Sequence, residues 1–331
     1  MKTLVTRFFD ALFITRPILL IPVWGYFLLG YYRASLAFHP SALVPFPVLG
    51  RDFPMLLTLP HEAAIALFML SLSVAATYIL NQIADLHTDK ENSGLPLLAK
   101  AGVPLALAHA ENIVLTLVPL VYAFAMGGTL RIFFLAAFGL NLVYNLRPFY
   151  FTGRPYLDFL TNALGFGVVA FGIGWLSANG GTLGGTTAFF RAAAPYALLM
   201  VAGSINSTLP DVEGDRRTGK VTTLVYLGWK RANVLSTIAV ALAFLLAAMN
   251  RDGIAGITAL VSLPLFIKYH FSGKIEDGTR TFQTGGGFLM LMTVPVFPWF
   301  FFYGLLTYLA TRIYFRVRHN TDYPSPGIAK E

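Results

Sequence analysis

The sequence contains no cysteine and has few charged residues. Without cysteine the chain forms no disulfide, no thiolate metal site, no covalent haem attachment and no cysteine nucleophile. Charged residues make up only 12% of the chain, whereas soluble domains contain about 25%. Hydrophobic residues make up 56%, and apolar runs of about twenty residues recur with short polar breaks. The composition therefore predicts one integral membrane domain over residues 1–331.

Hydropathy predicts an all-α protein with nine transmembrane helices. Residues 1–16 place basic side chains before an apolar stretch that has no small-residue cleavage site, so we expect an interfacial amphipathic segment rather than a signal peptide. Residues 312–331 are expected to form a polar C-terminal tail. The expected spans are 17–37, 62–84, 103–125, 130–146, 157–177, 191–209, 231–249, 254–271 and 288–311.

Lysine and arginine are distributed unevenly among the predicted loops. With the N-terminus inside, most of them fall on the cytoplasmic side, so we expect a multi-pass protein of a bacterial or archaeal cytoplasmic membrane. Arg312, Arg316 and Arg318 do not fit, because an odd number of spans places them outside. We attribute the net charge of +8 to the inner loops and to anionic lipid, and we expect no nucleic-acid partner. The outer loops hold only Arg33, Arg51, Arg131, Arg191 and Arg251.

Two acidic runs each end a long apolar segment. The first run, NQIADLHTD, contains Asn81, Asp85 and Asp89, and the second, DVEGD, contains Asp211 and Asp215. Residues four apart on an α-helix differ in direction by only about 40°, so each run presents a stripe of oxygen ligands on one helix face. The predicted topology places both stripes on the cytoplasmic side of the membrane. Carboxylates at a membrane boundary are costly unless they pair with cations, face water or bind metal.

Two such stripes facing each other can hold two Mg²⁺ ions and, through them, a diphosphate. A single pair of aspartates at a helix end is usually a solvated cap, but two runs on one membrane face argue against that interpretation. Glu213 projects from the other side of its helix and His87 lies off its stripe, so we expect both to be solvated. Because His61, His109 and His270 show no metal spacing, no zinc site is expected.

Three separated sequence patterns occur in the order that one membrane-enzyme family shows. The first run continues as DKENSGLPLLAKAG over 89–102, and the second as DRRTGKVTTLVYLG over 215–228. Between them lies YNLRPFYFTGRPYLDFLTNALGFG over 144–167. Together they resemble the UbiA superfamily of intramembrane prenyltransferases, and Arg16-Pro17 and the region 22–24 also fit the first helix of that family. The resemblance extends over nearly the whole chain.

The resemblance implies a fold and a reaction. The fold is a nine-helix bundle around a central cavity. The reaction is transfer of a prenyl group from a polyprenyl diphosphate to a lipophilic acceptor, which makes the protein a transferase for alkyl or aryl groups other than methyl. Bound Mg²⁺ and basic side chains would stabilise the departing diphosphate where water is scarce.

The resemblance also implies roles for particular residues. Asn81, Asp85 and Asp89 would hold one Mg²⁺, and Asp211 and Asp215 would hold the other. We expect Asp85, Asp211 and the aromatic Tyr144 to be catalytic, since an aromatic face can stabilise an allylic cation. The candidates for binding the diphosphate are Arg16, Lys100, Arg147 and Arg154, and Asn162 is a buried amide that needs a partner.

The sequence departs from the family pattern in places that bear on the acceptor. Gln82 stands where the family often has an aspartate, and the lysine frequent near Thr152 is missing, so Arg147 or Arg154 must supply that charge. The segment 95–97 lacks the Arg-Pro common in several quinone-pathway branches. We expect an aromatic quinone precursor as acceptor, while a glycerol-phosphate lipid, a tetrapyrrole alcohol and a carotenoid stay open.

An ion-coupled membrane transporter is the alternative from a different class of protein. Such a transporter uses carboxylates near the membrane midplane, in duplicated halves of the chain. Here the acidic runs end their spans, which favours the enzyme. The sequence leaves the oligomeric state and the length of the prenyl chain open, and membrane lipid is the remaining expected partner.

Overall fold

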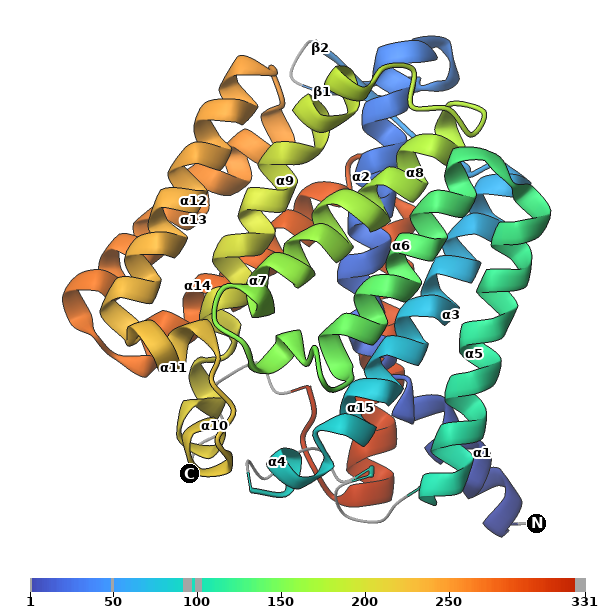
Figure 1. The fold of residues 1–331 in the computed structure, drawn as a ribbon. Coiled ribbons are helices and arrows are strands. Elements are labelled where there is room, and N and C mark those ends of the chain that lie inside the picture. The colour runs from blue at the N-terminus through green and yellow to red at the C-terminus, as the bar shows by residue number, and fades with distance from the viewer. Residues whose placement is uncertain (1, 49–50, 92–96, 99–102, 325–331) are drawn as a thin grey trace.

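The computed structural model describes residues 2–48, 51–91, 97–98 and 103–324. These residues are mostly helical, and the long helices run side by side (Figure 1). A π-helical segment, Ala163–Ala170, joins α7 to α8, and a hairpin of β1 (Val44–Val48) and β2 (Arg51–Met55) follows α2. The α-helices are α1 Lys2–Ile14, α2 Leu20–Phe38, α3 His61–Ala84, α4 Leu86–Glu91, α5 Leu105–Met126, α6 Gly128–Asn145, α7 Leu157–Asn162, α8 Phe171–Ala178, α9 Thr186–Ser207, α10 Val212–Thr218, α11 Thr223–Leu227, α12 Trp229–Met249, α13 Gly253–Ser272, α14 Ile275–Thr293 and α15 Trp299–His319.

Within the described residues, eight helical stretches are long and apolar enough to cross a membrane. These stretches confirm the predicted all-α, multi-pass integral membrane protein. Their members are Val5–Phe38, His61–Ala84, Leu105–Met126, Gly128–Asn145, Leu157–Ala178, Thr186–Thr218, Trp229–Met249 and Gly253–Ser272. Helices α14 and α15 are of similar length, with 19 and 21 residues, but they carry more polar side chains and are not among the eight.

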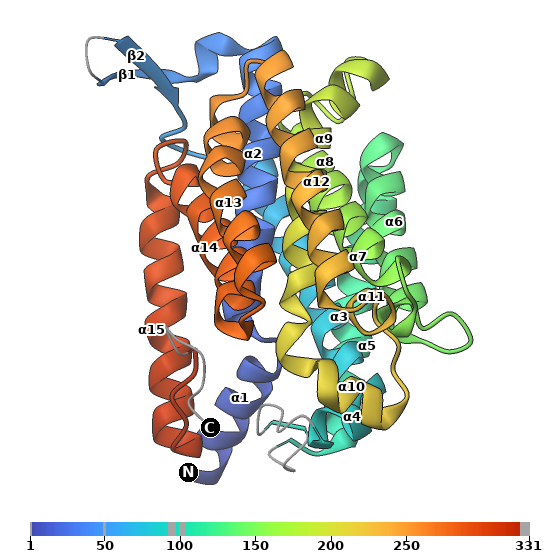
Figure 2. The same ribbon diagram turned by 90° about the vertical axis from the view of Figure 1, so that its left-hand side faces the viewer.

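The expected span over 288–311 is wrong, because two antiparallel helices share those residues. Helix α14 ends at Thr293, and α15 begins at Trp299 and runs back beside it (Figure 2). Pro295 lies in the turn and Pro298 caps α15. Proline lacks the amide hydrogen that a helix interior needs, so the helix ends before them. The C-terminal end of α15, with Arg316 and Arg318, therefore lies at the end of the bundle where α1 lies, not at the opposite end.

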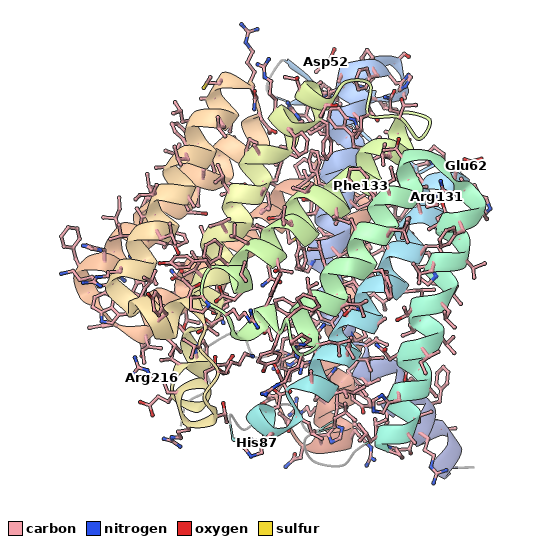
Figure 3. All side chains as sticks on the ribbon, in the orientation of Figure 1. Asp52, Glu62, His87, Arg131, Phe133 and Arg216 are labelled. Atoms are coloured by element: carbon pink, nitrogen blue, oxygen red, sulfur yellow. The ribbon has the colours of Figure 1, made fainter. Side chains whose placement is uncertain are left out.

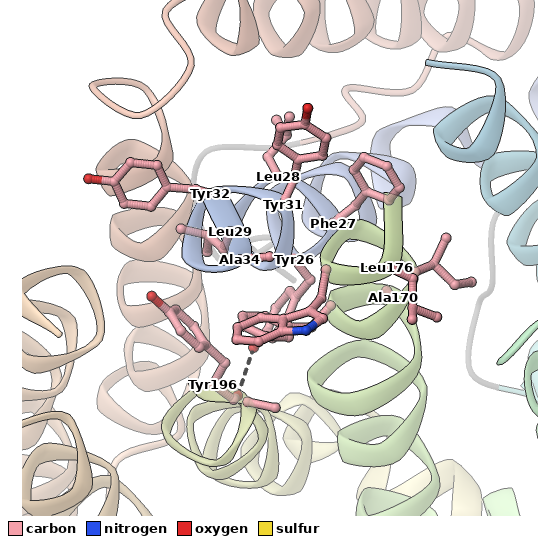
Figure 4. Packing of buried hydrophobic residues seen from close by; sticks show 14 of the residues in the cluster. Tyr26, Phe27, Leu28, Leu29, Tyr31, Tyr32, Ala34, Ala170, Leu176 and Tyr196 are labelled. Atoms are coloured by element: carbon pink, nitrogen blue, oxygen red, sulfur yellow. Dashed lines mark hydrogen bonds between the residues drawn. The ribbon is translucent and has the colours of Figure 1, made fainter. Parts of the chain in front are cut away.

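The core is densest where α2 meets α8 and α9. A Cβ atom on Gly30 would lie 1.9 Å from the Phe171 carbonyl oxygen, and one on Gly174 would lie 2.0 Å from that of Phe27. Only glycine permits such a close approach of two helix backbones. Next to this contact the Tyr26 hydroxyl donates a hydrogen bond of 3.2 Å to the Tyr196 carbonyl (Figure 4). This packing fixes α2, whose N-terminal end leads from the candidate site.

The two ends of the bundle differ. One end carries the short helices α1, α4, α10 and α11, and we call it the motif end (Figure 1). Figure 3 labels His87 and Arg216 there, whereas Asp52, Glu62 and Arg131 lie at the opposite end. The hairpin also lies at the opposite end, where the amide of Leu56 donates to the carbonyl of Val296 at 2.7 Å.

Candidate functional site

The first acidic run follows α3 across the junction with α4. The amide of Asp85 donates to the Asn81 carbonyl and that of Asp89 to the Asp85 carbonyl, each at 2.8 Å. These bonds between residues four apart preserve helical spacing through the junction. The Asn81 side-chain amide also donates to Asp85 Oδ2 at 3.3 Å. The three side chains therefore form the predicted stripe.

The second acidic run begins in the turn Leu209–Asp211 and continues into α10. Helix α10 packs against α4, so the two runs face each other. Asp215 is buried, whereas the Glu213 side chain is 84% exposed and pairs with Arg217 at 3.4 Å. The structure thus confirms that Glu213 points away from the site. Gly219, with φ of 75°, ends α10 in a left-handed conformation and turns the chain back toward the run.

A cavity of about 200 Å³ opens between the two runs at the motif end. All five predicted metal ligands line it, together with Arg16, Tyr144 and Asn162. The sequence patterns did not indicate a site role for the other lining residues. The lining consists of Arg16, Asn81, Asp85, Asp89, Tyr144, Thr152, Asp158, Asn162, Ser204, Ser207, Thr208, Asp211, Asp215, Lys220 and Thr222.

Lys220 is the basic residue that sequence reasoning missed. Its ammonium lies 2.7 Å from Asp85 Oδ2, and the Tyr150 hydroxyl donates to Asp85 Oδ1. Burial opposes the charge on Lys220, but the Asp85 carboxylate outweighs it, so the pKa of Lys220 lies above its ordinary value. Burial and Asp85 likewise raise the pKa of Tyr150, which keeps this phenol protonated as a donor. The sequence signal that could have identified Lys220 is its position directly after Gly219, the glycine that ends α10.

Arg16 occupies the other side of the cavity. Its backbone adopts φ of 51° and ψ of 62°, a left-handed conformation that is unusual for arginine. The guanidinium lies 3.8 Å from Asp89 Oδ2, and its buried Nε finds no hydrogen-bond partner among the residues that the structure describes. Burial raises the pKa of Asp89 above its ordinary value, and Arg16 offsets only part of that shift.

Two of the predicted diphosphate-binding residues, Arg147 and Arg154, are described by the structure and do not join Arg16 in the cavity lining. Arg147 is exposed and lies over the Tyr150 ring at 5.6 Å, and Arg154 donates to the Pro148 carbonyl. Lys100 lies outside the described residues. Lys220, in contrast, lines the cavity together with Thr152, because the chain returns there after α10.

Polar residues of the middle pattern support the cavity wall. Asp158 accepts hydrogen bonds from the amide of Thr223, at 2.7 Å, and from its hydroxyl. The amide of Tyr156 in turn donates to the Thr223 hydroxyl at 2.7 Å. The Asn162 amide finds the partner it needs in the hydroxyl of Ser204, at 2.8 Å. The bonds to Thr223 tie the segment that follows Lys220 to α7 and the turn before it, and the bond to Ser204 ties α7 to α9.

The oxygen atoms that line the cavity suit a hard divalent cation, but they do not surround one common point. Among the described residues, no three histidine, aspartate or glutamate side chains lie close enough to hold a metal ion. Asp85 instead faces Lys220 and Tyr150. Counted over the residues that the structure describes, the cavity nevertheless collects five aspartates and two basic residues, an excess of three acidic side chains. Carboxylate and amide oxygens are the ligands that Mg²⁺ prefers.

Fold and site together define an integral membrane protein whose helical bundle carries an acid-lined cavity at one end. The pattern of the UbiA prenyltransferase family matches residues 54–281, and the chain belongs to this family. Membership of a prenyltransferase family supports a transferase. The helices that carry the two acidic runs lie at one end of the bundle, which also favours a transferase over a transporter. No curated protein matches the sequence.

Three solved structures have similar folds. A UbiA homologue from Archaeoglobus fulgidus bound to GPP and Mg²⁺ is 22% identical, with a TM-score of 0.60 over 90% of this chain and 99% of that one. A digeranylgeranylglyceryl phosphate synthase is 16% identical, with a TM-score of 0.60 over 93% and 99%. An apo UbiA homologue from Aeropyrum pernix K1 is 17% identical, with a TM-score of 0.57 over 83% and 96%.

Proposed function

We propose that the protein transfers a prenyl group from a polyprenyl diphosphate to a lipophilic acceptor and releases diphosphate. One observation is the main support for this proposal. Two acidic runs more than a hundred residues apart in the sequence, together with Arg16 and Lys220, close one polar cavity at the end of a membrane bundle. Such a cavity suits a substrate with a highly charged head group and a hydrophobic tail. The homologue that holds GPP and Mg²⁺ supports the same proposal.

The charge balance of the cavity favours two divalent ions. Five aspartates face two basic residues, and a diphosphate would add further negative charge. Like charges this close repel strongly at low dielectric. We assign Asn81, Asp85 and Asp89 to one Mg²⁺ and Asp211 and Asp215 to the other. When bound, the ions would neutralise the diphosphate as it leaves the allylic carbon.

The protein's own groups orient the substrate and stabilise its charge. Arg16 and Lys220 approach the cavity from different segments and can donate to the diphosphate from both sides. Lys220 can do so after releasing Asp85 to a metal ion. Tyr144 presents an aromatic ring and Asn162 an amide toward the same space. The ring can stabilise positive charge at the allylic carbon, and the bundle excludes water that would capture it.

For the acceptor we propose an aromatic quinone precursor. A glycerol-phosphate acceptor would bring a second phosphate that needs cations of its own. Within the described part of the chain, the cavity offers only Arg16 and Lys220 as basic residues, and the diphosphate uses both. An aromatic acceptor without phosphate avoids that demand and can enter from the lipid.

Mass spectrometry of reaction products tests the proposal directly. Purified protein is incubated with Mg²⁺, geranylgeranyl diphosphate and either a hydroxybenzoate-type acceptor or glycerol-phosphate lipid. We expect a prenylated aromatic product whose formation stops in excess EDTA and resumes when Mg²⁺ is restored. Product formation in verified absence of divalent ions would refute the metal assignment, and product from the lipid alone would refute the proposed acceptor.

A further inference from the structure

Helix α15 lies outside the residues that match the family pattern, yet it packs against the turn Pro17–Leu19, directly after Arg16. Near its start the Phe300 ring approaches α2, 3.7 Å from the position of a Cβ on Gly25. Phe300 is only 4% exposed, whereas Leu306, Ile313 and Val317 are more than 60% exposed. The start of α15 therefore meets α2, and several large side chains farther along the helix face outward. In Figure 2, α15 runs along the outside of the bundle.

The C-terminal end of α15 binds α1 through a buried carboxylate. Arg318 donates to both oxygens of Asp10 at 3.0 Å each, and the Tyr314 hydroxyl donates to Asp10 Oδ1 at 2.7 Å. Asp10 is 4% exposed. The Tyr314 ring stacks on Phe13 with centroids 3.9 Å apart and planes 9° from parallel. We call Asp10, Phe13, Tyr314 and Arg318 the terminal clamp.

The terminal clamp is continuous with the turn that presents Arg16 to the cavity. The amide of Arg16 donates to the carbonyl of Phe13, the clamp residue, at 3.1 Å. From the opposite side, α3 holds the same turn, because Gln82 donates to the Ile14 carbonyl at 2.8 Å and Tyr78 to the Leu19 carbonyl at 3.0 Å. A non-glycine residue with positive φ persists only where its surroundings hold it.

We propose that the terminal clamp positions Arg16 for the diphosphate, with α15 acting as a strut between α2 and α1. Asp10, Tyr314 and Arg318 are positioning residues that do not line the cavity themselves. The catalytic meaning of this inference rests on the proposed function, since Arg16 matters for turnover only if a diphosphate occupies the cavity. The strut itself is a property of the fold.

Asp10→Asn and Arg318→Gln test the clamp by removing one partner each. We expect the KM for the prenyl diphosphate to rise about tenfold with little change in kcat, because weakening a charged contact made throughout the reaction reduces binding. Arg318→Lys keeps the charge but loses the bidentate geometry, so a smaller rise is expected. Arg316→Gln is the matched control, because Arg316 is an exposed arginine two positions away on the same helix.

A double-mutant cycle separates positioning of Arg16 from general damage. In an Arg16→Gln background, Asp10→Asn should raise the KM no further, because the residue that the clamp positions is already gone. An equal rise in both backgrounds, or an unchanged KM in folded Asp10→Asn, would overturn the proposal.

Hydrogen exchange gives a readout that does not depend on turnover. The amides of Thr15, Arg16, Ile18 and Leu19 should exchange faster in Asp10→Asn and Arg318→Gln than in wild type and Arg316→Gln. Unchanged exchange would refute the strut. If wild-type protein binds no prenyl diphosphate but the exchange difference is present, the proposed function fails and the strut stands.

Discussion

At the residue scale, the site is organised around Asp85. This buried carboxylate receives donors from three segments, namely Asn81 on α3, Tyr150 in the loop before α7, and Lys220 after α10. A buried carboxylate needs such partners, because an uncompensated charge is costly at low dielectric. Lys220 thus supplies the positive charge that the buried Asp85 carboxylate needs.

The second acidic run offers the cleanest test of the metal ligands. Asp211→Asn should reduce prenyl transfer by more than about 10²-fold, if one carboxylate ligand matters as much as one oxyanion donor. Glu213→Gln should do little, because its side chain points to solvent from the same helix end. Steady-state product formation by both variants, each intact by size exclusion, makes the comparison. Equal losses would disprove the assignment of the second run.

Asp85 and Lys220 should be coupled in stability. Asp85→Asn leaves a buried ammonium without its carboxylate, so we expect a loss of about 3 kcal/mol. Adding Lys220→Met removes that ammonium and should recover a large part of the loss, although neither variant transfers prenyl groups well. Thermal unfolding of the two single variants and the double variant measures the coupling. Additive losses in melting temperature would contradict the ion pair.

At the element scale, the position of the site depends on how α2 and α8 approach each other. Glycines at the crossing bring the two backbones into contact, and α2 leads from the turn that carries Arg16. The break between α14 and α15 is a second such feature. It sends the last helix back to the motif end, where Arg318 meets Asp10.

A methyl group at the crossing should separate the helices. In Gly174→Ala the new Cβ would lie 2.0 Å from the Phe27 carbonyl oxygen, which is rigid backbone, so we expect a destabilisation of about 3 kcal/mol or more. Gly139→Ala in α6 is the control, because nothing lies within 4 Å of its Cβ position and alanine favours the helix. Melting temperatures in detergent measure both. Equal stability of the two variants would contradict the close approach.

At the scale of the whole molecule, the two motifs and the end of α15 share one end of the bundle. An odd number of spans had placed Arg312, Arg316 and Arg318 on the side opposite the motifs. Because α15 returns to the motif end, that conflict disappears. With these residues at the motif end, the excess of basic side chains at that end grows. We therefore expect the motif end to face the cytoplasm.

Cysteine labelling tests this arrangement in a chain that has no native cysteine. Arg216→Cys and Asn320→Cys should react with a membrane-impermeant maleimide only from the cytoplasmic side, and Asp52→Cys only from the other side. Labelling is compared in intact and in opened cells or vesicles. Reaction of Arg216→Cys and Asn320→Cys from opposite sides would restore the odd number of crossings and refute the described course of α15.

Features that depend on near neighbours along the chain could be predicted from the amino-acid pattern alone. Hydropathy placed most of the helices, and the four-residue spacing placed Asn81, Asp85 and Asp89 on one stripe, because helix geometry alone relates such residues. The same spacing sent Glu213 outward. Family resemblance rested on these local patterns and was confirmed.

Contacts between residues far apart in the chain could be known only from the three-dimensional packing. Lys220 and Asp85 are 135 positions apart, and Arg318 and Asp10 are 308 apart, so no local period relates them. Hydropathy also merged parts of α14 and α15 into one span, because the apolar residues on both sides of the turn form a continuous run. The basic partners of Asp85 and Asp10 were therefore fixed by packing between helices, which a one-dimensional pattern does not encode.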